Sequence, residues 1–452
     1  MKPDGFTGLT ALLSEQAAAL NYDSLAPQAV ELVRQCVLDY VAVAIAGSTD
    51  PLAIILLQEA IEAGEAEASA VIGHRTRLSP ASAALVNGAM AHALDYDDVN
   101  LSMPGHPTAV VLAALLGLAE ANKLSGRELV AAFVAGYETA CRVGMAVQPG
   151  HYAHGFHSTG TVGCFGAAAG AGRLLGLQPD KMRQALGVAG SQAAGLKAQF
   201  GSMCKPFHAG RAAQSGLLAA KLALRGFTSH PDLLECEQGF CRTFSTDFHP
   251  EAALAEPADG LHLFSNLFKF HASGYFTHAP IECVRRIRDE HSVKTDQVAG
   301  ITIRLGQVVE RVCNLSDPQT GNDCKFSVKH VTAMALAGMD TASVDIYNLA
   351  TARDPLLAKL RNMTSCEFSP DRTATLAEVE LRLHDGRRLS ASHDSGLPAT
   401  DIAGQGKRLE AKFHALVAPI LGPERSRKLA HCISDLQALP DVGELMRLAT
   451  PG

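Results

Sequence analysis

Between about Leu9 and Phe227 the chain is a long series of helical patterns rich in Ala, Gly and Leu. Apolar residues recur there at intervals of three and four, and many segments are apolar around most of their circumference. Such helices must be buried among other helices, and small residues let neighbours approach closely. The pattern predicts a large all-helical domain, with helices over residues 27–46, 52–63, 79–94, 107–121, 126–146, 160–175, 179–194 and 210–224.

The pattern changes near Pro257. Residues 299–305 (AGITIRL) and 377–383 (AEVELRL) alternate apolar and polar positions, which is typical of strands. An Asp385-Gly386 turn then predicts a hairpin with residues 389–393. Helical patterns lie between these strands, at residues 277–290, 330–337 and 354–362.

The fold class predicted is therefore mainly α. A large helical domain spans residues 1–264 and is completed by the helical tail, 401–452. A smaller α+β domain with a short antiparallel sheet spans residues 265–400. Two domains also suit the length of 452 residues, because single hydrophobic cores stop growing well below it.

The composition argues against several classes of binding partner. The net charge of -7 lacks the basic footprint of a nucleic-acid binder, and an aromatic content of 5% without Trp argues against stacking platforms. The most apolar stretch, Thr108–Ala119, is too short to span a membrane, and the N-terminus does not resemble a signal peptide. Eleven scattered cysteines favour reduced thiols. We expect a cytoplasmic protein without nucleic-acid or membrane partners.

Three basic residues each stand where a long apolar helix is predicted to begin. His106 precedes one helix, His157 precedes the next with Ser158 or Thr159 as its N-cap, and the Lys205-to-His208 segment precedes a third. Backbone N–H groups and the positive end of the helix dipole face the same way there. The sequence thus predicts a site for a carboxylate ligand. Read singly, each residue could instead be a capping imidazole or a solvated lysine.

An acidic segment, HALDYDD at residues 92–98, closes an Ala-rich helix. Carboxylates are misplaced at a helix C-terminus unless a cation or ligand justifies them. Asp95 and Asp98 would share a face if the helix continued, and Asp97 would point elsewhere. Asp97 and Asp98 are more typical of structural or solvated positions. The segment is a candidate for orienting a catalytic His or Lys.

Familiar catalytic templates are missing from the sequence. It contains no GxSxG, HExxH or Walker A motif. His151, His154 and His157 have a spacing that suggests a metal face, but glycines interrupt any helix there and no carboxylate sits at a ligand-like offset. We therefore predict no metal.

Four blocks carry a resemblance to a known family: residues 92–98, 105–120 (GHPTAVVLAALLGLAE), 154–177 (HGFHSTGTVGCFGAAAGAGRLLGL) and 203–216 (MCKPFHAGRAAQSG). They resemble the MmgE/PrpD family, which includes 2-methylcitrate dehydratases, cis-aconitate decarboxylases and iminodisuccinate epimerases. Residues 269–278 (KFHASGYFTH) resemble the family's next active-site block. The resemblance implies a helical domain with a smaller α+β domain, a homodimer, and chemistry without a metal or organic cofactor.

By matching motif, Asp95, His106, His157 and Lys205 correspond to active-site positions of the decarboxylase branch. Two positions depart from that branch: Val99 stands where it has a threonine, and Gly274 where it has a histidine. His271 could replace that histidine only after a shift in register. Residues 274–278, with Tyr275 and His278, look more like the epimerase pattern.

These assignments give a mechanistic hypothesis. Lys205 and the helix ends near Gly160 and Gly210 hold the substrate carboxylates. Further contacts to the substrate come from His208, Ser158, Thr159, His271 and His278. His106 and His157 transfer protons, Asp95 orients a cationic partner, and Tyr275 is a second acid on the opposite face. Crowding of Lys and His depresses their pKa values and favours a neutral base.

The interpretation is a lyase, of dehydratase or decarboxylase type, that acts on a small di- or tricarboxylate. One alternative is an epimerase or isomerase of a dicarboxylate such as iminodisuccinate. The other is a helical interaction protein that has lost the chemistry.

Overall fold

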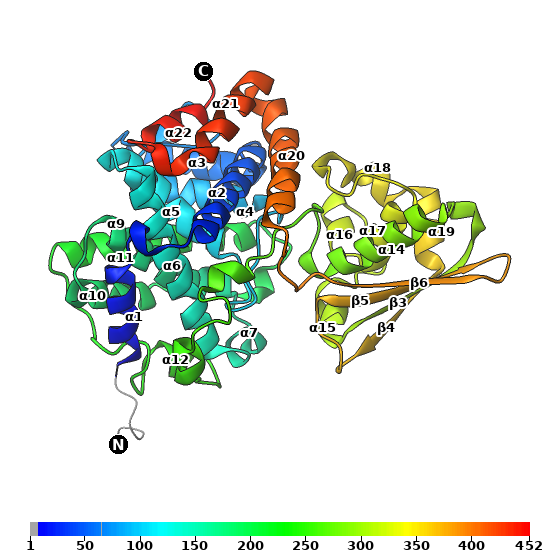
Figure 1. Cartoon of the computed structure of the whole chain (residues 1–452), viewed down its shortest axis with the longest axis horizontal. Helices are drawn as coiled ribbons and strands as arrows, with labels where there is room; N and C mark the ends of the chain where they lie inside the picture. The colour runs from blue at the N-terminus through cyan, green and yellow to red at the C-terminus, as the bar shows by residue number, and fades with distance from the viewer. Residues whose placement is uncertain (1–7, 65) are drawn as a thin grey trace. The chain divides into compact units, whose positions relative to one another are not determined.

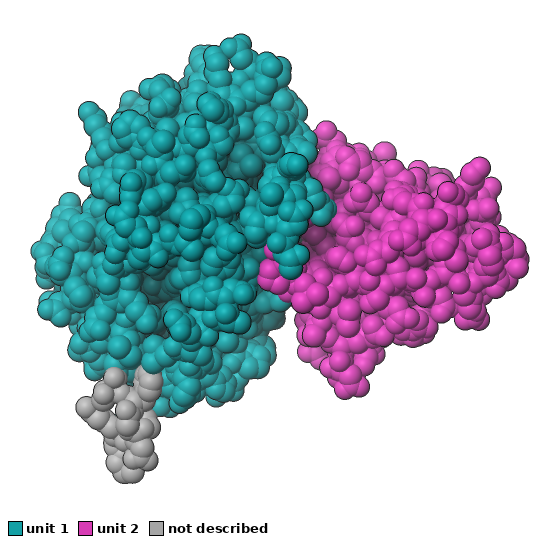
Figure 2. Space-filling model, viewed as in Figure 1, with its two compact units in different colours: residues 1–268, 400–452 teal, residues 269–399 magenta. Residues whose placement is uncertain are grey.

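The computed structural model describes residues 8–64 and 66–452, and it divides into two compact units (Figures 1 and 2). Unit 1 comprises Met1–Phe268 and Thr400–Gly452, and unit 2 comprises Lys269–Ala399. The boundaries predicted from sequence were 264/265 and 400/401.

Unit 1 is built from helices, apart from a two-stranded antiparallel ribbon of β1 (Ser69–Ala70) and β2 (Arg77–Leu78). Its helices are α1 (Leu9–Ala19), α2 (Pro27–Gly47), α3 (Pro51–Glu62), α4 (Pro80–Ala93), α5 (Pro107–Asn122), α6 (Gly126–Val147), α7 (Gly150–His154), α8 (Ser158–Thr161), α9 (Gly163–Leu174), α10 (Pro179–Gly190), α11 (Cys204–Leu224), α12 (Phe240–Phe244), α13 (Pro250–Leu254), α20 (Ile402–Leu421), α21 (Pro423–Ser434) and α22 (Gly443–Leu448). The mainly α fold is confirmed, and all eight helices predicted for this region are present.

The centre of unit 1 is a set of helices buried on all sides. Every residue of α5 from Pro107 to Ala119 is buried, and α5 packs against α4, α6, α9 and α11. Helix α6 is long and apolar enough to cross a membrane, and the bent pair α2–α3 passes the same test. However, 89% of the apolar window of α6 is buried inside the protein, so its position in the core accounts for its apolar character.

Helices α4 and α11 meet backbone to backbone. A Cβ added to Gly210 would lie 2.0 Å from the carbonyl oxygen of Leu85, and one added to Gly88 would lie 2.8 Å from the Cα of Gly210. Only glycine permits so close an approach. The contact lies within about two turns of the end of α4 and of the start of α11, so it places these two helix termini side by side.

Unit 2 is an α+β unit with a four-stranded sheet in the order β4-β3-β5-β6. The strands are β3 (Val298–Gly306), β4 (Thr364–Ser369), β5 (Leu376–Leu383) and β6 (Arg388–Asp394), and the helices are α14 (His278–His291), α15 (Gln307–Val312), α16 (Gly321–Lys325), α17 (Val328–Leu336), α18 (Leu349–Ala352) and α19 (Pro355–Asn362). Helix α14 packs against β5 and β6, while α17 and α19 contact β4 (Figure 1).

The predicted antiparallel sheet is present in β3, β5 and β6, with β5 and β6 joined at the Asp-Gly turn. Alternate residues of β3 and β5 are buried, as their pattern predicted. Strand β4 was not predicted, and it pairs with β3 in parallel, so the sheet is mixed.

Candidate active site

Four imidazoles, an ammonium and two carboxylates gather in unit 1, and we call this group the His/Lys cluster. Its members come from the end of α4 and the loop after it, from the starts of α5 and α8, and from the first turn of α11. They are His92, Asp95, Asp97, His106, His157, Lys205 and His208. The ring centroid of His92 lies 4.3 Å from that of His106 and 5.8 Å from that of His157.

Asp97 joins two of the imidazoles. Its carboxylate lies 2.9 Å from Nδ1 of His92 and 3.1 Å from Nδ1 of His106, and its residue is 2% exposed. Burial alone would raise the pKa of Asp97, but the charges and hydrogen bonds of His106 and His92 hold it well below its usual range. Burial also lowers the pKa of His92 to about 4, outweighing the opposite effect of Asp97. At neutral pH, Asp97 is therefore a carboxylate that accepts a hydrogen bond from a neutral His92.

This arrangement fixes which ring nitrogens can react. Nδ1 of His106 also lies 2.7 Å from the backbone oxygen of Asp98. A carbonyl and a carboxylate can only accept, so Nδ1 carries the proton in both His92 and His106. Nε2 of each ring is then the atom that can take up a proton, and Nε2 of His92 is buried without a hydrogen-bond partner among the described residues.

Lys205 is paired with Asp95. Its Nζ lies 2.9 Å from Oδ1 of Asp95, and the two side chains are 11% and 13% exposed. Asp95 has φ +52°, a left-handed conformation that is costly for a residue other than glycine. The ring of Phe200 lies 5.4 Å from the same ammonium. Asp95 thus fixes the position of the Lys205 ammonium.

His157 provides a neutral imidazole. Burial is the main reason that its pKa lies well below its usual value, and the nearby charges of His92, Lys205, His106 and His208 add to the shift. Its Nδ1 lies 3.1 Å from Nδ1 of His208, whose pKa is also lowered by burial. One of these rings donates to the other, and both are neutral at pH 7, chiefly because both are buried.

Two helix starts differ from the predictions. His157, and neither Ser158 nor Thr159, precedes the short α8, and no side chain caps that helix. Thr159 is buried, and its Oγ1 accepts a hydrogen bond from the backbone N–H of His106, at 3.2 Å. Ser158 is also buried, at 1% exposure. The hydroxyl of Thr159 therefore ties the starts of α5 and α8 together.

Helix α11 begins at Cys204, so Lys205 and His208 lie inside its first turn rather than before it. The acidic segment also departs from its prediction, because α4 ends at Ala93. Asp97 faces the His/Lys cluster. Asp98 instead accepts a hydrogen bond from the hydroxyl of Thr108, at 2.5 Å. Both carboxyl groups are buried, not solvated.

The remaining predicted residues lie in unit 2, where they form a group of their own. Nε2 of His271 lies 3.0 Å from Glu282, and its Nδ1 lies 2.7 Å from the hydroxyl of Thr341. The ring centroid of His278 lies 5.0 Å from that of His271 and 5.2 Å from that of Tyr275. The Tyr275 hydroxyl donates to the backbone oxygen of Ser395, and burial raises its pKa.

Local packing accounts for one of the two departures from the decarboxylase pattern, that at Gly274. A Cβ at Gly274 would lie 3.1 Å from Sγ of Cys313 and 3.2 Å from the ring of Phe326, so a histidine would require its neighbours to move. Val99 is 7% exposed, and its backbone exchanges two 2.8 Å hydrogen bonds with Leu267.

One group in the described part of the chain has the composition of a metal site. Single ligand atoms of His92, Asp95, Asp97 and His106 all lie within 4.8 Å of one another. These residues fit a metal chemically, but Lys205 already supplies a positive charge at Asp95. The triplet of His151, His154 and His157, whose spacing suggested a metal face, does not form a common site. His151 instead bonds to Thr161 and to the Phe244 carbonyl.

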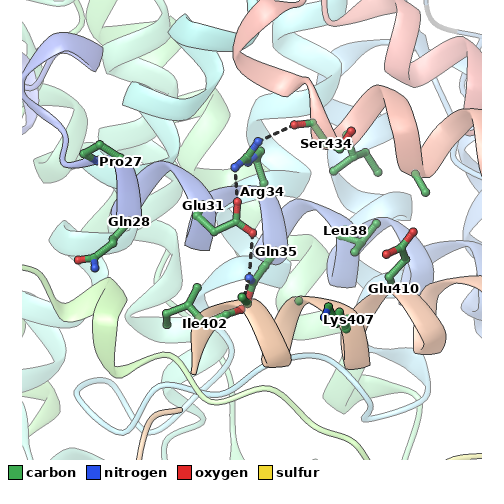
Figure 3. A pocket seen from close by; sticks show the side chains of 14 residues that line it. Pro27, Gln28, Glu31, Arg34, Gln35, Leu38, Ile402, Lys407, Glu410 and Ser434 are labelled. Atoms are coloured by element: carbon green, nitrogen blue, oxygen red, sulfur yellow. Dashed lines mark hydrogen bonds and ion pairs between the residues drawn. The ribbon is translucent and has the colours of Figure 1, made fainter. Parts of the chain in front are cut away.

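A separate cavity of about 640 Å³ lies between α2, α20 and α21 (Figure 3). Its charged residues bond to their neighbours: Arg34 pairs with Glu31 and donates to the Ser434 carbonyl. None of the predicted site residues lines this cavity. Because it lacks converging imidazoles, we place the candidate site at the His/Lys cluster.

The structure places the predicted residues Asp95, His106, His157 and Lys205 near one another, together with His92 and Asp97, which were not predicted as site residues. The available signal was their place in the same seven-residue segment as Asp95. The His92 ring stacks on that of His157 and lies tilted against that of His106, and the Asp97 carboxylate contacts Nδ1 of His92 and of His106.

Two family models match the N-terminal and C-terminal parts of the chain, and the second extends beyond unit 2 into α20 and α21. The family model described as MmgE/PrpD N-terminal domain matches residues 11–253, and the MmgE/PrpD C-terminal domain matches residues 271–437. The chain is 26% identical to cis-aconitate decarboxylase of Aspergillus terreus over 470 residues, covering 98% of this chain and 96% of the relative.

Human cis-aconitate decarboxylase is 29% identical over 389 residues, which cover 82% of this chain and 80% of the human protein. The cis-aconitate decarboxylase-like protein oryM of Aspergillus oryzae is 26% identical over 479 residues, covering 99% and 98%. These relatives support a lyase. The two family models together span most of the sequence, and the chain therefore belongs to the MmgE/PrpD family.

Proposed function

We propose that the protein is a lyase that removes a carboxyl group from a small tricarboxylate such as cis-aconitate. The observation that carries this proposal is the placement of one ammonium beside several neutral imidazoles in the His/Lys cluster. An ammonium binds a substrate carboxylate, and neutral imidazoles exchange protons near pH 7. The names of the relatives supply the substrate class.

In the proposed reaction Lys205 binds a carboxylate that remains on the substrate. The bond to the departing carboxyl carbon breaks, carbon dioxide leaves, and the electron pair is delocalised toward a remaining carboxylate. Nε2 of His106, or the ring of His157, takes up a proton from solvent and delivers it to the carbanion, which forms the new C–H bond and returns the imidazole to its neutral form. Asp95 orients Lys205, while Asp97 holds the rings of His92 and His106.

Further residues complete the proposal. His208 and the starts of α5 and α8, near Ser158 and Thr159, add donors for the substrate. The acid role predicted for Tyr275 and the carboxylate contacts predicted for His271 and His278 stay predictions. The protein would act as a homodimer in the cytoplasm. It would need no metal or organic cofactor, because Lys205 supplies the positive charge that the substrate requires.

The test is incubation with candidate acids in deuterium oxide, followed by mass spectrometry and NMR. Loss of carbon dioxide from cis-aconitate, with one deuterium in the product, is the expected result. Loss of water from a hydroxy-tricarboxylate would instead assign a dehydratase. Deuterium uptake with inversion and no mass loss would assign an epimerase.

His157→Ala serves as the matched negative control, because it removes an imidazole without leaving a buried charge unpaired. A second measurement, of the melting temperature with added polycarboxylates, tests the alternative that the chain is a non-catalytic interaction protein. If no acid is turned over and no polycarboxylate raises the melting temperature, the chain binds no such ligand and the lyase proposal fails.

A further inference from the structure

A buried lysine outside the His/Lys cluster contacts the loop that carries Asp95 and Asp97. Lys412 of α20 has a side chain that is 5% exposed, and its Nζ lies 2.6 Å from Oδ1 of Asp39 in α2. The same ammonium donates a 2.8 Å hydrogen bond to the backbone oxygen of Tyr96 and lies 3.8 Å from the centre of the Tyr96 ring. Residue 96 is therefore held at both its carbonyl and its ring.

The position of Lys412 is fixed by the packing of α20 on α2. Gln35 donates a 2.9 Å hydrogen bond to the carbonyl of Ile402 at the start of α20, as Figure 3 shows, and accepts one of 2.9 Å from Gln405. Asp39 follows Gln35 by one turn of α2, and Lys412 follows Gln405 by two turns of α20. The glutamine contacts thus set the register in which Asp39 meets Lys412.

Tyr96 stands between the two carboxylates of the His/Lys cluster. Asp95 faces Lys205 and Asp97 faces two imidazoles, although no helix or strand supports this loop. The left-handed backbone conformation of Asp95, a residue other than glycine, costs about 1–3 kcal/mol. Such a conformation persists only where the surrounding contacts hold it in place. Lys412 is the buried group that contacts the intervening residue.

We propose that Lys412 is a positioning residue that clamps Tyr96 and thereby aims Asp95 and Asp97 at the catalytic groups. The inference deepens the proposed function, on which its kinetic readout rests. It also gives the C-terminal segment a role in the chemistry. This role is indirect, because Lys412 acts through Tyr96 and itself touches neither substrate nor reacting atoms. The competing view is that the Lys412–Asp39 pair only stabilises the fold.

The test compares two backgrounds in the full-length protein. Asp39→Asn neutralises the buried partner first, because removing Lys412 alone would leave a buried carboxylate unpaired. The double variant D39N/K412M then removes the ammonium, and D39N/K412Q replaces it with a side chain of similar size that still donates a hydrogen bond. Lys407→Met, at an exposed position of the same helix, is the matched control.

Turnover should fall about 10- to 100-fold from D39N to D39N/K412M, since a misplacement of about 1 Å costs up to about 100-fold. D39N/K412Q should recover part of this loss, and K407M should match wild type. Hydrogen exchange of the amides at residues 94–98 should accelerate in D39N/K412M relative to D39N, while α5 and α9 stay protected. If D39N/K412M does not fold, D39N/K412Q is compared with D39N instead.

The two hypotheses can fail separately. Equal exchange at residues 94–98 in D39N and D39N/K412M would overturn the clamp, as would unchanged turnover or a Gln variant no better than the Met variant. A wild-type protein that turns over no acid would defeat the proposed function only. The exchange measurement, which needs no substrate, would still decide whether Lys412 holds the loop.

Discussion

Asp98→Asn should change how the stability of the protein depends on pH. The Asp98 carboxyl is 1% exposed. Burial is the main cause that raises its pKa to about 8; hydrogen bonds from Thr108 and Asn266 oppose the shift, and the charges of Asp39 and Asp97 add to it. At neutral pH the folded protein therefore keeps a proton on Asp98 that the unfolded chain releases.

The sign follows from this difference. The folded-state pKa is raised, so the contribution of Asp98 is most favourable below the unfolded value of about 4 and is lost as pH rises toward 8. The slope is at most about 1.4 kcal/mol per pH unit, so the interval from pH 6 to 8 is worth roughly 2–3 kcal/mol. An asparagine does not titrate, and D98N should lack this loss.

The assay is thermal unfolding of wild type and D98N at pH 6, 7 and 8. The amide can raise or lower the stability by a constant amount at every pH. The melting temperature of D98N relative to wild type should nevertheless increase as pH rises. Because large proteins often unfold irreversibly, unfolding rates at fixed temperature provide a second measure. Asp371→Asn, at an exposed position, is the control and should run parallel to wild type. Parallel curves for D98N would refute the assignment of a protonated Asp98.

Four further outcomes concern the His/Lys cluster. Lys205→Met should lower kcat/KM by about 100-fold or more with an unchanged circular dichroism spectrum, whereas Lys221→Met on the same helix should not. His157→Ala should lower kcat by about 100-fold or more, whereas His154→Ala at an exposed position should leave it intact. Because the pKa values of His157 and His92 are lowered, kcat/KM should not drop between pH 7 and 6; a decline with a midpoint near 6.5 would contradict neutral imidazoles. Dialysis against EDTA should leave turnover unchanged, and loss of activity restored by one divalent ion would show that the four-residue group holds a metal.

Much of the fold could be predicted because its signals are local. The period of three to four in helices such as α5 and the alternation in β3 and β5 identify elements directly. Strand β4 (TSCEFS) was missed because its polar positions do not alternate cleanly with apolar ones. The start of α11 was placed too late because a residue before proline is usually biased away from helix, yet Lys205 is helical here.

His106, His157 and Lys205 were predicted from their places at the starts of apolar helices, and Asp95 from its acidic segment. The family blocks then marked the same four residues as active-site positions. The roles of His92 and Asp97 depend on α4 ending at Ala93 and on the left-handed turn at Asp95, which the rest of the fold imposes. Helical spacing assigned the wrong face to Asp97 because the helix had already ended.

The glycine contact between α4 and α11 has a consequence for how such a catalyst can diversify. Where two backbones touch directly, no side chain is available to repack, and a methyl group at either glycine would force the helices apart. The distance between the side chains at the end of α4 and those at the start of α11 is thus set by the contact of the two main chains. New substrates would be accommodated by exchanging residues around a frame whose dimensions stay constant.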